Sequence, residues 1–129
     1  MKLDADTMKP IYVQIAEWLE TEILAGNIGS DEKIYSQYQL AEMFNINPAT
    51  AAKGLSILAE EGILYKKRGL GMFVSPGARE GILLKRREGT LKQLIFDLLL
   101  EAQRLGIPEN ELTEMIRQMK NSQKGEMKS

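Results

Sequence analysis

The stretch that decides the fold is FNINPATAAKGLSILAEEGILYKKRGLGMFV, from Phe44 to Val74. Asn47 is a good helix N-cap, and Pro48 suits the first helical position, where its missing N–H removes no intrahelical hydrogen bond. Small and apolar residues then recur at spacings of three and four: Ala51, Leu55, Leu58 and Ala59. The sequence therefore predicts a helix that begins at Asn47 and ends at Gly62.

Two short runs rich in β-forming residues follow this helix, at 63–67 and 72–75. The residues between them are Arg68-Gly69-Leu70-Gly71, and glycines at that spacing suit a hairpin turn with positive φ angles. The second half of the stretch is therefore predicted to be a β-hairpin with a basic tip.

Two further helices are predicted before this stretch. The first begins after Pro10 and ends near Gly26, with an apolar residue at every fourth position: Ile11, Ile15, Leu19 and Ile23. The second begins at Ser36, because Gln39 three residues later completes a capping box. Its buried side is expected to consist of Leu40, Ala41 and Phe44. Three helices followed by a hairpin make a winged helix-turn-helix.

A longer apolar period begins beyond Pro76-Gly77. The first helix of this part is predicted to be long, to end at Gly106, and to present one apolar face: Leu84, Leu91, Leu94, Ile95, Leu98, Ala102 and Leu105. Pro108 then opens a shorter helix whose apolar face includes Leu112, Met115, Ile116 and Met119. Gly81 and Gly89 each weaken the long helix by about 1 kcal/mol relative to alanine, and whether it bends there stays open.

The predicted fold is mainly α with a small β-hairpin. Residues 1–76 form the winged helix-turn-helix domain, residues 77–120 form a two-helix segment, and residues 121–129, which lack an apolar period, form a disordered tail. Two helices with exposed apolar stripes cannot make an independent core. Either the amino-terminal domain or the same helices of a second chain must cover them, and a second chain explains the long stripe better. A homodimer is therefore the favoured prediction.

Composition excludes several kinds of chemistry. The 129 residues include no cysteine and no histidine, which removes disulfides, thiolate nucleophiles, imidazole metal ligands and histidine-based triads. No nucleotide-binding glycine fingerprint is present. The sequence thus predicts a protein that is not an enzyme, with no cofactor and no metal. The first ten residues contain no apolar signal region, so a cytoplasmic protein without a membrane segment is expected.

Positive charge is concentrated in one section although the net charge is only -1. The section contains Lys66, Lys67, Arg68, Arg79, Lys85, Arg86, Arg87 and Lys92. Such a section can attract phosphates even when the whole molecule is slightly acidic. A charge run can equally be a solvated face, and Trp18 is interpreted as a core or interface residue rather than a stacking platform.

The chain resembles the GntR family of bacterial transcription regulators. The resemblance extends from Pro10 to Val74 and rests on PIYVQIAEWLETEILAGNI, on KIYSQYQLAEMFNINPATAAKGLSILAEEGIL and on YKKRGLGMFV, which are in the family's order and spacing. The N-P-A-T helix start and the short carboxy-terminal part of two helices are similar to the YtrA-like branch.

This resemblance implies a cytoplasmic homodimeric DNA-binding regulator, a repressor, that binds an inverted-repeat operator. The helix from Pro48 to Glu60 would enter the major groove, and the hairpin tip would lie in or near the minor groove. The implied DNA-binding residues are Ser36, Gln37, Tyr38, Asn47, Pro48, Ala49, Thr50, Ala52, Lys53, Ser56, Lys66, Lys67, Arg68, Gly69 and Gly71. Ser36 is expected to serve as a helix cap, as a phosphate contact or as both.

The chain also departs from the family pattern, since many members have arginine where this chain has Tyr38, Pro48 and Ala52. The base preference of arginine-bearing relatives therefore cannot be transferred. We expect thymine methyl groups to contact Ala49 and Ala52, and the amino end of the helix to bind a phosphate through unpaired N–H groups. Lys66, Lys67 and Arg68 should supply most of the attraction, together with the segment from Lys85 to Arg87.

An alternative function is a winged-helix adaptor that binds protein and does not bind specific DNA. The sequence does not identify an operator, the regulated genes or a small-molecule effector.

Overall fold

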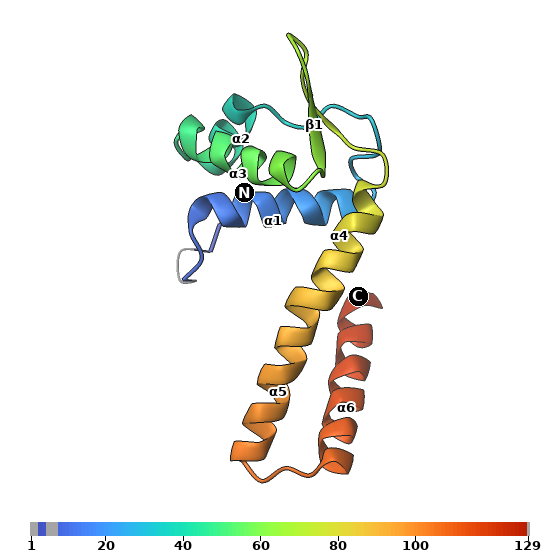
Figure 1. Cartoon of the computed structure of the whole chain (residues 1–129). Helices are drawn as coiled ribbons and strands as arrows, with labels where there is room; N and C mark the ends of the chain where they lie inside the picture. Colours follow the sequence, from blue (N-terminus) through green and yellow to red (C-terminus); the bar gives the residue numbers. More distant parts are fainter. Residues whose placement is uncertain (1–2, 5–7, 129) are drawn as a thin grey trace. The chain divides into compact units, whose positions relative to one another are not determined.

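The computed structural model of this chain describes residues 3–4 and 8–128 and consists of two compact units, Met1–Arg86 and Arg87–Ser129. The first unit contains α1 (Ile11–Leu24), α2 (Gln37–Phe44), α3 (Pro48–Glu60), the hairpin strands β1 (Leu64–Lys67) and β2 (Gly71–Val74), and α4 (Ala78–Arg86) (Figure 1). This order of elements is a winged helix-turn-helix, so the predicted fold class is confirmed.

Local sequence signals explain where α2 begins and ends. The Ser36 hydroxyl accepts a hydrogen bond from the Gln39 N–H at 3.1 Å, and the Gln39 side chain accepts one from the Ser36 N–H at 2.8 Å, which is the predicted capping box. The helix ends at Phe44, and the C-cap residue Asn45 adopts a left-handed conformation with φ of 54°, which asparagine tolerates better than most residues. The turn from α2 to α3 is thus specified locally.

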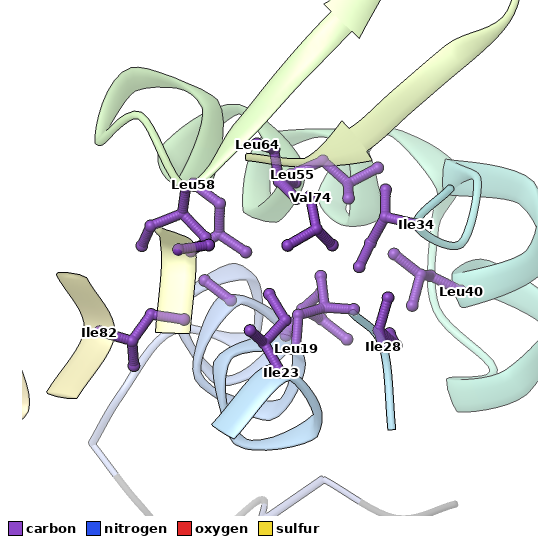
Figure 2. Close-up of a cluster of buried hydrophobic side chains, with 14 of the residues drawn as sticks. Leu19, Ile23, Ile28, Ile34, Leu40, Leu55, Leu58, Leu64, Val74 and Ile82 are labelled. Carbon is purple, nitrogen blue, oxygen red and sulfur yellow. The ribbon is translucent and has the colours of Figure 1, made fainter. Parts of the chain in front are cut away.

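The core of the first unit lies between the three helices and the base of the hairpin (Figure 2). Each element contributes fully buried side chains, including Leu19 from α1, Leu40 from α2, Leu58 from α3, Val74 from β2 and Ile82 from α4. Burying a side chain of this size contributes roughly 1.5–3 kcal/mol. The hairpin is therefore fixed at its base by the same core that packs the helices.

Trp18 belongs to the margin of this core. Its ring lies 5.0 Å from the Phe44 ring in an edge-on arrangement and 5.9 Å from the Tyr35 ring, measured between centroids. Packing against the core cluster agrees with the interpretation of Trp18 as a core residue.

Helices α1 and α3 approach each other closely at Gly54. A Cβ atom at Gly54 would lie 2.9 Å from the Tyr12 carbonyl oxygen and 3.0 Å from Ile15 Cγ2. Glycine lowers helix stability by about 1 kcal/mol relative to alanine, but here it allows the two backbones to come together. The close approach fixes the position of α3 on α1.

Ion pairs attach α4 to the rest of the first unit. The Glu20 side chain on α1 is 3% exposed and pairs with Lys85 and Arg86, and Arg86 also donates a hydrogen bond to the Glu17 carbonyl at 2.8 Å. Lys85 reaches the Glu61 carboxylate at 2.8 Å. The contacts pair a buried carboxylate with cations, which avoids the cost of an isolated buried charge.

The boundary between the units differs from the predicted boundary at residue 76. Ala78 and Ile82 of α4 are buried in the core of the first unit, and the second unit begins at Arg87. The glycine and proline before α4 indicated a break in the chain, but the apolar side chains of α4 pack on the amino-terminal domain.

The second unit contains a π-helical segment, η1 (Arg87–Leu91), and then α5 (Lys92–Arg104) and α6 (Glu109–Lys128). Gly89 lies in η1, where the α-helical hydrogen-bond pattern is interrupted, whereas Gly81 lies inside α4. Of the apolar side chains that the structure describes in this unit, only Ala102 and Leu112 are buried. The second unit therefore has almost no core of its own.

Helix α6 has 20 residues and is shorter than the continuous helical run of α4, η1 and α5 over 78–104, as predicted. One prediction about α6 is wrong. The expected disordered tail from Asn121 is helical as far as Lys128, and Ser129 lies outside the described residues. The segment lacks an apolar period, but Gln, Lys, Glu and Met are strong helix formers that can continue an existing helix.

Replacing Gly54 with alanine should destabilise the first unit. The new methyl group would press on the Tyr12 backbone oxygen and on Ile15, and overpacking of this kind costs about 1–3 kcal/mol, more than the gain of about 1 kcal/mol in helix propensity. Chemical denaturation followed by circular dichroism would measure the loss. Gly81→Ala in α4 is the matched control, because nothing lies within 4 Å of its added Cβ, and it should leave stability unchanged or raise it. Equal effects of the two substitutions would contradict the role of Gly54.

Candidate nucleic-acid interface

The outer face of α3 is made of small and polar side chains. The opposite face buries Ala51, Gly54, Leu55 and Leu58 in the core, so the residues between them must turn outward. Ala49, Lys53 and Ser56 are exposed, and Thr50 and Ala52 are half-buried. The structure thus brings the predicted α3 residues together on one accessible surface, over which a partner could approach the helix backbone closely.

The amino end of α3 does not offer the unpaired N–H groups that were expected to bind a phosphate. The Ala49 N–H donates to Asn47 Oδ1 at 2.8 Å, and the N–H groups of Thr50 and Ala51 donate to the Asn47 carbonyl at 3.0 and 3.2 Å. Pro48 has no N–H to donate. Asn47 therefore accepts from the donors of the helix start and Pro48 removes one donor, so the predicted unpaired N–H groups are absent from this end of α3.

Helix α2 precedes α3 in the helix-turn-helix, and its first turn contains a second group of predicted site residues. Tyr38 is 69% exposed, Gln37 is half-buried, and the Ser36 hydroxyl is engaged in the capping box. The first N–H groups of a helix, here those of Gln37 and Tyr38, have no intrahelical acceptor. Ser36 is therefore a helix cap in this structure, while the N–H groups that follow it and the Tyr38 hydroxyl remain candidates for polar contacts.

The hairpin presents its basic residues at an exposed tip. Strands β1 and β2 pair in antiparallel register, with Lys66 opposite Met72 and Lys67 opposite Gly71. The Leu70 N–H donates to the Lys67 carbonyl at 2.9 Å, closing the turn, and Gly69 and Gly71 have φ angles of 79° and 107°, as predicted for glycine at these positions. The exposed residues of the tip are Lys66, Lys67, Arg68, Gly69, Leu70 and Gly71.

Leu70 is a candidate interface residue that was not predicted from the sequence. It is 60% exposed at the tip of the hairpin and lies between the two glycines that were selected. A large apolar residue in a polar turn was a signal that could have identified it.

Aromatic rings support one side of the hairpin. The Lys67 ammonium lies 4.5 Å from the centroid of the Phe73 ring, and that ring stacks on Tyr65 at 5.9 Å. The Tyr65 hydroxyl donates a 2.7 Å hydrogen bond to Asp31. This hydrogen bond, with desolvation and the negative charge of Asp31, raises the pKa of Tyr65. The row of contacts orients Lys67 at the tip and connects the hairpin to the loop after α1.

Lys85 and Arg86 do not contribute to an open basic surface, contrary to the prediction. Both pair with the buried Glu20, and Lys85 also pairs with Glu61. Burial lowers the pKa of Lys85, but hydrogen bonds to Glu20 and Glu61 outweigh that effect, so the net shift is upward from 10.5. The contribution of this group to stability is therefore present throughout neutral pH and is lost only as pH rises through the raised pKa. Arg87, by contrast, is exposed in η1.

Two findings on the described residues concern metal binding and membrane crossing. No group of three acidic side chains among residues 3–4 and 8–128 could hold a metal ion. Within the same part of the chain, the helices are too short or too polar to cross a bilayer.

These features define a DNA-binding fold of the winged helix-turn-helix class. Helix α3 has small side chains on its outer face, and the hairpin has a basic tip. The family model "Bacterial regulatory proteins, gntR family" matches residues 11–74, which include α1 to β2. The chain belongs to the GntR family, so the family assignment made from the sequence is confirmed.

Individual relatives extend the match beyond this domain. The HTH-type transcriptional repressor YtrA of Bacillus subtilis (strain 168) is 28% identical over 129 residues, which is 100% of this chain and 98% of YtrA. Other curated relatives are longer, and this chain covers 34% of one and 18% of another.

Solved structures are also similar to this chain. A GntR family transcriptional regulator from Listeria monocytogenes aligns with a TM-score of 0.73 and 28% identity over 88% of this chain and 97% of that chain. The structure of AraR(DBD) in complex with operator ORX1 aligns with a TM-score of 0.54 and 30% identity over 58% of this chain and 95% of that chain.

Replacing Asn47 with alanine should destabilise the first unit, because the Ala49 N–H would lose its acceptor. Loss of an N-cap side chain costs about 0.5–2 kcal/mol. Thermal or denaturant unfolding of the purified variant measures this cost. Asn47→Asp retains a side-chain acceptor and should be close to the parent protein, so an equal loss in both variants would argue against the capping role.

Proposed function

We propose that this protein is a sequence-specific DNA-binding transcription regulator that acts in the cytoplasm as a homodimeric repressor. The observation that supports this function most strongly is the outer face of α3, which is free of bulky side chains and belongs to the same unit as a hairpin with an exposed basic tip. No catalytic step is part of the proposal.

The comparisons support a DNA partner. AraR(DBD), which shares the fold of the first unit, was solved in complex with operators named ORX1 and ORE1. YtrA, which is similar over the whole chain, is named a transcriptional repressor. We extend these two properties, operator binding and repression, to this protein.

We propose that α3 reads the major groove mainly through its shape and its methyl groups. Ala49 and Ala52 have no polar side chain, so they can contact thymine methyl groups, while Thr50 and Ser56 can exchange hydrogen bonds with base edges or phosphates. A helix with short side chains can also enter the groove deeply. Arginine readout of guanine, which needs a long bidentate side chain, is absent from this face.

Electrostatic attraction comes mainly from the hairpin in this proposal. Lys66, Lys67 and Arg68 are exposed, and each phosphate contact that releases a counterion strengthens binding at low salt. Gly69 and Gly71 keep the tip narrow, so that its backbone can approach the minor groove. The amino end of α2, with Gln37 and Tyr38, can bind the phosphates that flank the major groove.

The second unit supports the homodimer. Its described apolar residues are largely exposed on both helices, notably Leu91, Leu94, Ile95, Phe96, Leu98, Leu99, Leu105, Met115, Ile116 and Met119. Exposed apolar area of this extent marks an interface. The same apolar face occurs in every copy of the chain, so two copies related by a two-fold axis can bury each other's apolar face.

A symmetric dimer predicts the symmetry and the half-site spacing of the operator. Two α3 helices related by a two-fold axis recognise an inverted repeat whose half-sites lie about one helical turn apart, roughly 34–36 Å. Selection of bound duplexes from a random pool by the purified full chain tests binding, symmetry and spacing together. The expected result is an inverted repeat that survives competition by excess random duplex at physiological salt.

The adaptor hypothesis predicts a different outcome of that selection. A winged-helix adaptor would enrich no sequence and would lose all duplexes to the competitor. Enrichment of a single half-site without symmetry would support DNA binding but would contradict the dimer.

Removal of charge from the hairpin tip should reduce the salt dependence of DNA binding. In Lys66→Ala/Arg68→Ala, the slope of log affinity against log salt should fall by about 0.9 for each phosphate that the variant no longer neutralises. Fluorescence anisotropy with the selected duplex at several salt concentrations measures the slope. Lys120→Ala/Lys124→Ala removes the same charge from α6 and should leave the slope unchanged. A similar fall in both variants would indicate a net-charge effect rather than binding at the tip.

A charge on the apolar face of α5 should dissociate the dimer. Leu94 is 59% exposed within one chain, so Leu94→Glu costs little in the monomer but buries a carboxylate in the proposed interface. Sedimentation or light scattering should show a monomer at micromolar concentration, and affinity for the inverted repeat should fall with it. Arg104→Gln changes the charge by the same amount at an exposed position on the polar side of α5 and should remain dimeric. A dimeric Leu94→Glu variant would place the interface elsewhere.

A further inference from the structure

We propose that Tyr12 is a positioning residue for DNA binding, which holds Lys53 at the edge of the α3 surface so that this lysine contacts a backbone phosphate and not a base. The inference rests on the proposed function and specifies how one residue of that interface acts.

The inference starts from a contact between α1 and α3. The Lys53 ammonium lies 4.0 Å from the centroid of the Tyr12 ring, which is the geometry of a cation–π interaction. Tyr12 is half-buried in the first turn of α1, and Lys53 is exposed on α3. The lysine is the longest side chain on the outer face of α3, and the ring restricts where its charge can lie.

The position of the Tyr12 ring shows the direction in which the Lys53 side chain points. Gly54, the residue after Lys53, is the point where α3 touches the backbone of Tyr12. Tyr12 therefore lies along the flank of α3 that faces α1. A lysine that reaches this ring leans away from the middle of the outer face, where Ala49 and Ser56 are exposed.

This direction favours a phosphate over a base. When a helix lies in the major groove, base edges face the middle of its outer surface, whereas the sugar-phosphate backbone forms the walls on either side. A lysine ammonium is a compact charge that binds phosphate without demanding a particular geometry. Because the ring orders the lysine before DNA arrives, less side-chain entropy is lost when the phosphate contact forms.

Other charges near the pair do not replace Tyr12 in this role. The three acids of α1 have partners elsewhere in the first unit. Glu17 pairs with Lys9, and Glu20 pairs with Lys85 and Arg86. Glu22 accepts a hydrogen bond from Asn27. The Lys53 ammonium lies against the aromatic face of Tyr12, and a cation–π contact can persist while the ammonium donates hydrogen bonds outward.

Lys53→Met gives the first test. A phosphate contact predicts weaker binding by a similar factor for every duplex, with a salt slope lower by about 0.9 per contact and with unchanged preference at each base pair. The selected operator and a set of single-base-pair variants, measured by fluorescence anisotropy, give both quantities. A loss of preference confined to one base pair would show that Lys53 reads a base and would overturn the proposal.

A double-mutant cycle with Tyr12 gives the second test. Tyr12→Phe retains a ring and should bind like the parent protein, whereas Tyr12→Leu removes the ring and should weaken binding about two- to fivefold, the effect of an exposed cation–π contact. Once Lys53 is methionine, Tyr12→Leu should have no further effect on affinity. An equal loss in both backgrounds would show that Tyr12 acts through packing alone and would overturn the positioning role.

Thermal unfolding of each variant separates folding from binding. If Tyr12→Leu does not fold, Tyr12→Met, which also lacks a ring, replaces it in the cycle, and the base preferences of Lys53→Met still decide between a phosphate and a base contact. Failure of the proposed function has a different signature, because the unaltered chain would then prefer no duplex over random sequence.

Discussion

The close contact between α1 and α3 at Gly54 determines where the candidate reading surface lies. The missing side chain lets the α3 backbone approach the Tyr12 carbonyl and Ile15, and the buried face of α3 then fixes which residues turn outward. The exposed face follows from the packing of the opposite face. A single glycine, unfavourable for the helix itself, thus couples the stability of the core to the geometry of the surface.

The distribution of charge follows from the same packing. The acids of α1 and the basic end of α4 belong to one unit, and the buried Glu20 pairs with Lys85 and Arg86. Because both cations pair with this carboxylate, the exposed positive charge of the first unit is concentrated at the hairpin. A net charge of -1 is therefore compatible with DNA binding, because attraction depends on where the uncompensated charges are.

Local signals in the sequence were sufficient for most of the fold. The Ser36 capping box and the Asn47-Pro48 helix start each depend on a few neighbouring residues, so they could be identified without knowledge of the tertiary structure. The pairing of Arg86 with Glu20 could not, because the partners are 66 positions apart in the sequence and only the folded chain brings them together. The role of Gly54 was hidden for the same reason, since a glycine within a helix does not reveal which backbone approaches it. The extent of α6 was missed because helix propensity can continue a helix where no apolar period exists.

The second unit shows what an apolar period can and cannot specify. The recurrence of leucine from Leu91 to Leu105 requires that the face be covered, and in the structure these residues lie largely exposed within one chain. The period does not identify what covers them. Symmetry favours a second copy of the chain, because that copy presents the same apolar face at the same concentration and no other gene product is needed. In the proposed dimer each copy contributes one α3 helix, so the interface that removes apolar area from water would also bring two α3 helices into one assembly, and stability would be linked to recognition of an inverted repeat.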